Sequence, residues 1–194
     1  MKPSEVAVNF IFPHTYEVRL QGSYSQAYSA EKLHQFPAQL EEGDRTGLYV
    51  RVAPKSGAAW VGFFALGFDS EQVASAIYSS PDPDWLCVLS GGYVYMVDTI
   101  DPQRWTRIEQ RPVVEVRPLL ELNLLLFMGF TSISGWSGPD RSWITERLSW
   151  EGLSISQIQG QILRGAGWDA VADKEAPFEV DLLTGQSKGG ARPR

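Results

Sequence analysis

Short apolar segments alternate with turn-forming residues along most of the chain. Many of these segments are rich in aromatic and β-branched residues, and glycine, proline or aspartate separates one from the next. Brief segments bounded in this way are typical of β-strands. We predict strands at residues 6–12, 16–20, 48–52, 59–66, 85–89, 92–97, 105–108, 113–116, 122–128, 131–136, 142–150, 153–158, 161–165 and 178–182. So many brief strands predict an all-β fold of short antiparallel strands.

Two segments in the N-terminal half indicate helix instead. Residues 30–40 place Leu33, Phe36 and Leu40 at helical spacing, which is the pattern of a short amphipathic helix. Residues 69–77 begin with the spacing of a capping box. We therefore expect one or two short helices in the N-terminal half of an otherwise β-stranded chain.

Four leucines recur at a regular interval. Leu48, Leu86, Leu125 and Leu163 stand near the start of apolar segments and lie 38, 39 and 38 residues apart. One four-stranded blade of a β-propeller occupies about forty residues. The expected architecture is therefore a set of propeller-like small sheets, with a two-sheet sandwich as the alternative.

Length and charge limit the number of domains and the class of partner. A chain of 194 residues suits one domain, and we expect it at residues 1–186, with a flexible C-terminal tail at residues 187–194. The formal net charge is −6, and an acidic surface repels phosphate backbones. The densest basic segment is the tail itself, with Lys188, Arg192 and Arg194. Nucleic-acid binding is therefore not expected.

Cysteine usage and hydropathy indicate a cytoplasmic protein. Cys87 is the only cysteine, so no intrachain disulfide can form, and its apolar neighbours predict a buried small hydrophobe. The N-terminal segment lacks the apolar region of a signal peptide. No apolar stretch reaches the roughly eighteen residues that a membrane helix needs.

Residue types with catalytic or ligand-binding chemistry are sparse. The two histidines, His14 and His34, and one cysteine are too few for a zinc site. The chain contains no phosphate-binding glycine loop and no nucleophile elbow. We therefore expect no metal and no cofactor.

Paired carboxylates could still perform general acid–base catalysis. Glu115 with Glu121, or Asp169 with Glu179, could act as a general acid and base if the fold brought them together. Carboxylates that alternate with apolar residues along a strand usually face solvent instead. A carboxylate-dependent hydrolase or lyase acting on a sugar-like substrate is thus the alternative function.

Aromatic residues are unusually frequent, at 12% of the chain. Tyrosine and tryptophan combine a large contact area with a polar group and are enriched at interfaces. They could equally fill the core between sheets. If they are exposed, the candidate binding residues are Tyr93, Tyr95, Trp136, Trp143 and Trp168, with Asp169 beside the last of these.

Four motifs resemble those of a group of uncharacterised bacterial β-rich proteins. They lie at residues 91–99 (GGYVYMVDT), 147–153 (RLSWEGL), 167–169 (GWD) and 178–185 (FEVDLLTG). The resemblance covers about the C-terminal two thirds of the chain. It implies a bacterial, non-secreted origin and carries no activity, cofactor or catalytic residue.

The expected function is a non-catalytic binding or interaction protein. It follows from the missing catalytic motifs together with the abundance of aromatic residues. An immunity-type protein that neutralises a basic toxin is one specific form, because complementary charge speeds such an encounter. Partners would be another protein or a second copy of the chain.

Overall fold

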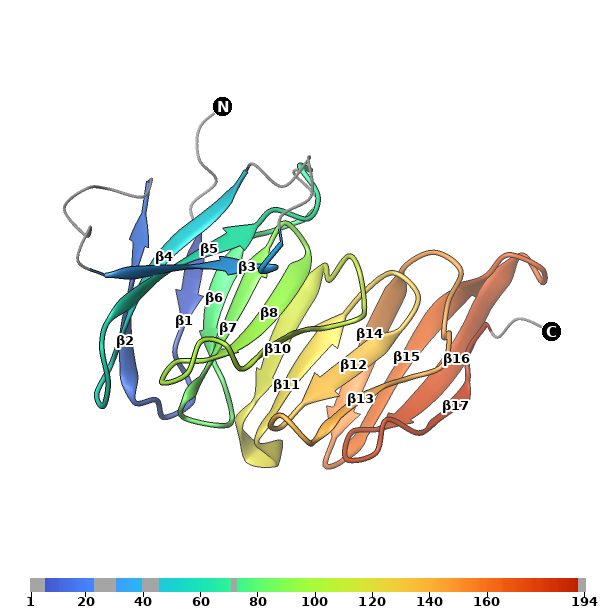
Figure 1. Ribbon diagram of the computed structural model, residues 1–194. Coiled ribbons are helices and arrows are strands. Elements are labelled where there is room, and N and C mark those ends of the chain that lie inside the picture. Colours follow the sequence, from blue (N-terminus) through green and yellow to red (C-terminus); the bar gives the residue numbers. More distant parts are fainter. Residues whose placement is uncertain (1–5, 23–30, 40–45, 71–72, 192–194) are drawn as a thin grey trace. The chain divides into compact units, whose positions relative to one another are not determined.

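The computed structural model describes residues 6–22, 31–39, 46–70 and 73–191. Strands account for 53% of the residues and helix for 2%, in small and mostly antiparallel sheets, so the predicted all-β fold is confirmed (Figure 1). The chain divides into two compact units, Met1–Glu109 (unit 1) and Gln110–Arg194 (unit 2).

Unit 1 contains two sheets. One has the order β2-β4-β5-β3, formed by Tyr16–Gln21, Gly47–Pro54, Trp60–Ala65 and Lys32–Phe36. The other has the order β1-β6-β7-β8-β9, formed by Ala7–Asn9, Ala76–Ser79, Trp85–Ser90, Tyr93–Asp98 and Trp105–Arg107. Strands β6 to β9 form an antiparallel meander. The outer strands β1 and β3 instead run parallel to their neighbours.

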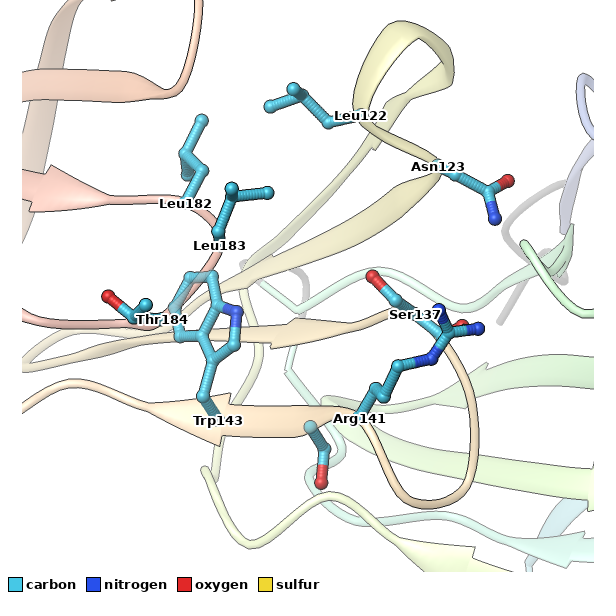
Figure 2. A pocket seen from close by; sticks show the side chains of 9 residues that line it. Leu122, Asn123, Ser137, Arg141, Trp143, Leu182, Leu183 and Thr184 are labelled. Carbon is cyan, nitrogen blue, oxygen red and sulfur yellow. The ribbon is translucent and has the colours of Figure 1, made fainter.

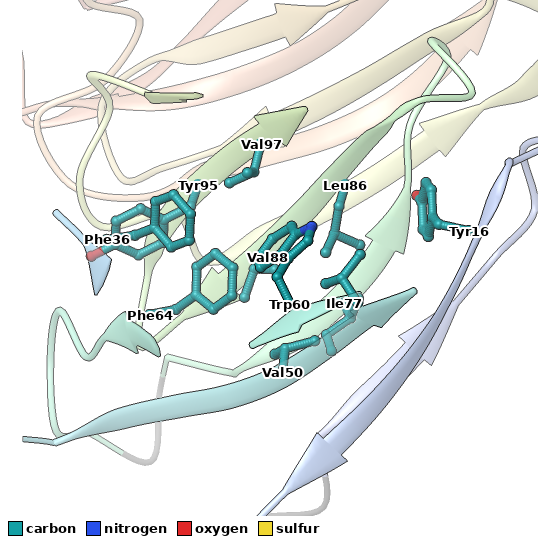
Figure 3. Packing of buried hydrophobic residues seen from close by; sticks show 11 residues of the cluster. Tyr16, Phe36, Val50, Trp60, Phe64, Ile77, Leu86, Val88, Tyr95 and Val97 are labelled. Atoms are coloured by element: carbon teal, nitrogen blue, oxygen red, sulfur yellow. The ribbon is translucent and has the colours of Figure 1, made fainter. Parts of the chain in front are cut away.

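The core of unit 1 is aromatic and lies between its two sheets (Figure 3). Alternate residues of β4, β5, β7 and β8 belong to this core, as the two-residue period of a strand requires. Rings from the first sheet, including Trp60 and Phe64, pack with aliphatic and aromatic side chains from β6, β7 and β8. Two buried phenols are satisfied by backbone carbonyls: Tyr16 donates to Trp85 O at 3.0 Å and Tyr95 donates to Ala65 O at 3.0 Å.

Unit 2 consists of two antiparallel four-stranded meanders. The first comprises β10 (Glu115–Leu119), β11 (Leu124–Met128), β12 (Ile133–Trp136) and β13 (Ser142–Ile144), with a short 3-10 helix, η2 (Leu120–Leu122), between β10 and β11. The second comprises β14 (Leu153–Gln159), β15 (Ile162–Asp169), β16 (Lys174–Asp181) and β17 (Ser187–Gly189). Leu124, Leu126 and Met128 of β11 share a buried cluster with Leu163 and Phe178 of the second sheet.

The leucine spacing corresponds to one four-stranded sheet. Leu86, Leu125 and Leu163 are fully buried and lie in β7, β11 and β15, each the second strand of its meander. Leu48 lies in β4, which pairs with both β2 and β5. The interval therefore equals the length of chain between the second strand of one meander and the second strand of the next.

Both predicted helices are wrong. Within residues 30–40 the chain forms β3, which pairs with β5, and Phe36 stacks on Phe64 with ring centroids 4.8 Å apart. Tertiary contacts of this kind override a weak local preference for helix. Within residues 69–77, β6 begins at Ala76 and pairs with β7. Positions 30, 40, 71 and 72 lie outside the described residues.

The C-terminal segment and Cys87 have defined places in the structure. Residues 187–194, expected as a flexible tail, begin with β17, which pairs with β16, and Ala191 is buried; residues 192–194 lie outside the described part. The division between the two units falls within the single domain expected at residues 1–186. Cys87 is fully buried in β7, as predicted, and burial raises the pKa of its thiol.

Candidate functional site

The six aromatic and acidic candidates occupy different environments. Tyr95 and Trp136 are 0% and 1% exposed, so their side chains serve packing and do not form a surface. Tyr93, two residues before Tyr95 on β8, is half-buried against the same core. The guanidinium of Arg107 lies 5.0 Å from the Tyr93 ring centroid, and Phe68 meets that ring edge-on. The Tyr93 ring therefore already has Arg107 and Phe68 of the same unit as its neighbours.

In unit 2, Trp143 and Trp168 line separate hollows. Trp143 is half-buried in one pocket (Figure 2). Trp168, near the end of β15, is 37% exposed and lines the other hollow. Asp169 follows it and accepts the backbone N–H groups of Val171 and Ala172 at 2.9 and 3.1 Å. Asp169 therefore stabilises the turn between β15 and β16.

The hollow beside Trp168, here called the acidic groove, has a volume of about 460 Å³. It is lined by Glu151, Gly152, Leu153, Ser154, Ala166, Trp168 and Glu175. Trp168 and Glu175 are directly paired across β15 and β16. Of the described residues that line the groove, two are acidic and none is basic. An exposed indole ring thus stands beside two carboxylates.

Ser149 holds the two sides of the acidic groove together. Its buried hydroxyl oxygen accepts the backbone N–H of Trp168 at 2.8 Å and that of Glu151 at 3.1 Å. The N–H of Trp150 donates to Trp168 O at 2.9 Å. These bonds attach the segment that carries Glu151 to the end of β15. The backbone of Glu151 is therefore held close to that of Trp168 by these three bonds.

Trp150, next to the groove residue Glu151, already contacts a cation. It is 37% exposed, and the guanidinium carbon of Arg147 lies 4.7 Å from its ring centroid. An arginine over an indole ring is the usual geometry of a cation–π interaction. This surface therefore contains an intramolecular example of the contact that an exposed tryptophan can offer to a partner.

The acid pairs expected from the sequence do not match this groove. Glu179 of β16 pairs with Arg164 of β15, which lies five residues before Asp169 on the same strand. Asp169 and Glu179 are therefore separated by about 16 Å along the sheet. Glu179 forms an ion pair with Arg164 at 2.6 Å. Glu115 likewise pairs with Arg117 at 2.7 Å, and Glu121 lies in η2, beyond the end of β10.

Sequence reasoning missed Glu151 and Glu175. Their proximity to Trp168 depends on strand register and on the Ser149 hydrogen bonds, neither of which has a sequence signature. The motif GWD at residues 167–169 draws attention to the neighbourhood, but only the pairing of β15 with β16 places Glu175 opposite the indole.

A third hollow, of about 620 Å³, lies in unit 1. His34 of β3 and Trp105 of β9 both line it, and the His34 ring meets Trp60 edge-on with centroids 5.6 Å apart. Burial lowers the pKa of His34, and the neighbouring charge of Lys32 lowers it further. Within the described part of the chain, histidine, cysteine, aspartate and glutamate side chains form no group of three or more that could hold a metal ion.

Comparisons with protein-family models, curated proteins and solved structures find no match to this chain. No helical segment among the described residues has the length and apolarity that a membrane crossing requires. The case for a function therefore depends on the geometry of the groove itself.

Proposed function

We propose that this chain is a binding protein that captures a basic segment of a partner protein through the acidic groove. One observation carries the proposal: the exposed ring of Trp168 lines the same hollow as Glu151 and Glu175, without a basic residue among the described lining. An arginine side chain of the partner would place its guanidinium against the indole face, with the carboxylates as hydrogen-bond acceptors.

The overall charge supports the same class of partner. A net charge of −6 attracts a basic protein at long range and raises the rate of association. An immunity-type protein that neutralises a basic toxin is one form of this function. A homodimer joined through two copies of the acidic groove is disfavoured, because the facing carboxylates would repel each other.

A second candidate function is favoured by the presence of two carboxylates in one hollow. In a hydrolase or lyase acting on a sugar-like substrate, Trp168 would stack on a sugar ring, and Glu151 and Glu175 would act as general acid and base. This function requires turnover, whereas the binding function requires only capture. Conversion of p-nitrophenyl glycosides, abolished in Glu175→Gln, would identify the enzyme.

The binding function is tested with two short peptides. Isothermal titration calorimetry would compare acetyl-Arg-Arg-Arg-amide with acetyl-Gln-Gln-Gln-amide. We expect only the arginine peptide to bind, and we expect added salt to weaken it. Trp168→Ala and Glu175→Gln should each weaken binding about fivefold or more, because each removes one of the contacts to the guanidinium.

Two variants outside the groove serve as matched controls. Phe130→Ala removes another exposed ring of unit 2, and Glu121→Gln removes another exposed carboxylate. Neither residue lines the acidic groove, so both variants should bind the arginine peptide as the unchanged protein does. Equal binding of both peptides, or equal loss in the controls and the groove variants, would rule out the proposal.

A further inference from the structure

The pocket around Trp143 lies where three connections of unit 2 meet. It is lined by Leu122, Asn123, Ser137, Arg141, Ser142, Trp143, Leu182, Leu183 and Thr184, and its volume is about 350 Å³. These residues come from the end of η2, the turn between β12 and β13, strand β13 itself, and the hairpin between β16 and β17. Pockets that hold small molecules begin at about 300 Å³, so this pocket suits a compact ligand.

The indole of Trp143 is held in place by two glycines. Gly135 pairs with Trp143 across β12 and β13, and a Cβ on Gly135 would lie 2.4 Å from ring atoms Cε2 and Cζ2. A Cβ on Gly185 would lie 2.6 Å from Cε3 of the same ring. The ring therefore occupies space that any other residue at these positions would fill. Such close packing orients the indole before a ligand arrives, which lowers the entropy lost on binding.

The surrounding loops are also fixed by hydrogen bonds. Asp181 Oδ1 accepts the backbone N–H groups of Leu183 and Thr184 at 2.8 and 3.1 Å, so this carboxylate serves the hairpin. On the other side, the backbone N–H of Ser137 donates to Arg141 O at 2.9 Å, and Nη2 of Arg141 donates to Ser137 O at 3.2 Å. In the view of Figure 2, Leu183 lies above the indole, and Arg141 and Ser137 lie to its right.

The chemistry of the lining divides into an apolar part and a cationic part. The indole and three leucines supply apolar surface, while Asn123, Thr184 and two serines supply neutral polar groups. Of the described residues that line the pocket, Arg141 alone is charged. A guanidinium has five N–H donors in a planar fork that matches a carboxylate. The lining therefore favours a ligand with one carboxylate and a compact apolar body.

We infer that the Trp143 pocket binds a small organic acid, with its apolar body against the indole and leucines and its carboxylate on Arg141. This site is distinct from the acidic groove in its residues and opposite in charge, so the two proposals stand or fall separately. A free aromatic or branched aliphatic acid and the C-terminal residue of a peptide present the same chemistry.

Calorimetry with a matched pair of ligands tests the inference on the full chain. The probes are 3-phenylpropionate and its uncharged analogue 3-phenylpropionamide. We expect the acid to bind about tenfold more tightly than the amide, the difference that one charge-assisted hydrogen-bond pair supplies. Arg141→Gln should remove this difference by weakening the acid alone. Arg117→Gln, which changes an arginine of β10 outside the pocket lining, should leave it unchanged.

A second variant keeps the test valid if Arg141→Gln disturbs the turn. Leu183 is 54% exposed, so Leu183→Asp should fold and place a negative charge at the pocket rim. We expect it to weaken binding of the acid about tenfold by charge repulsion. Leu120→Asp, at another exposed leucine outside the lining, is the matched control. Near-ultraviolet circular dichroism would verify the fold of each variant.

The results would distinguish a free organic acid from a peptide C-terminus as the ligand, and they could also rule out binding at this pocket. Tighter binding of acetyl-Gly-Gly-Phe with a free carboxylate than of 3-phenylpropionate would identify a peptide C-terminus, and the reverse order would identify a free acid. Equal affinity for acid and amide, binding that is unchanged in both Arg141→Gln and Leu183→Asp, or no binding of either acid would overturn the inference.

Discussion

Asp98 and Asp181 end the third strand of two different antiparallel meanders and form the same pair of backbone hydrogen bonds. Asp98 Oδ1 accepts the N–H groups two and three residues ahead at 2.9 and 3.1 Å. Asp181 Oδ1 does the same at 2.8 and 3.1 Å. A short carboxylate that satisfies the next backbone donors is a common way to start a tight connection. The same aspartate-to-backbone hydrogen bonds thus follow the third strand of both meanders.

The two aspartates should differ in their contribution to stability. The side chain of Asp98 is 7% exposed and also binds Arg104 at 2.8 Å, whereas Asp181 is half-buried. Removing Asp98 takes away a buried carboxylate that accepts two backbone N–H groups and binds Arg104, so Asp98→Ala should lower the free energy of unfolding by about 2–3 kcal/mol, against about 1 kcal/mol for Asp181→Ala. Urea denaturation measures both. An equal loss would contradict the assigned role of burial, and Asp98→Asn, which keeps one oxygen, should lose less.

Gly185 should be far less tolerant of alanine than Gly160. Both have positive φ, +72° and +56°, but a Cβ on Gly160 would meet nothing within 4 Å. Each substitution introduces left-handed strain of about 1 kcal/mol, and Gly185→Ala adds overpacking of about 1–3 kcal/mol against Trp143. Chemical denaturation gives the difference. Combining Gly185→Ala with Trp143→Ala should recover part of the loss, and strict additivity of the two changes would refute the steric explanation.

The imidazole of His34 should titrate below its ordinary pKa of 6.5. Burial is the main cause and the charge of Lys32 the second, while Asp101 acts in the opposite direction. Proton NMR resolves the two imidazoles of the chain, and the signal lost in His34→Gln is the relevant one. Lys32→Gln should raise this pKa and Asp101→Asn should lower it. No response to either change would contradict the assigned causes.

The same shift has a small consequence for stability. Because the folded state holds His34 neutral, the unfolded chain binds more protons at pH values between the folded pKa and 6.5. Stability should therefore rise with pH through this window and be lost as the pH falls through it. Thermal unfolding of His34→Gln, compared with the unchanged chain at several pH values, should show a weaker dependence there.

The thiol of Cys87 should be inert until the chain unfolds. It is fully buried, and burial raises its pKa, so little reactive thiolate forms near neutral pH. Mass spectrometry should detect no iodoacetamide adduct on the native protein and complete modification in urea. Rapid labelling of the native protein would show that β7 opens readily. Cys87→Ala controls for modification of other residues.

Much of the fold was predictable from local patterns. Apolar segments bounded by glycine, proline and aspartate indicated strands, and the leucine spacing matched the length of one four-stranded sheet. The burial of Cys87 followed from its apolar neighbours. The segment around Phe36 was predicted wrongly, because three apolar residues at helical spacing are too few to distinguish a short helix from the strand that forms there. The stacking of Phe36 on Phe64 decides between them.

The chain's own composition and spacing were enough to determine its strand-rich class, its acidic charge and the shortage of catalytic side chains. Which aromatic rings are buried was decided only by tertiary structure. Tyr95 and Trp168 were both candidate binding residues from the sequence, yet they are 0% and 37% exposed. The acidic groove and the Trp143 pocket were likewise decided only by tertiary structure. Strand register and loop hydrogen bonds bring residues distant along the chain, such as Arg141 and Leu183, to the lining of one pocket, and no local pattern predicts this.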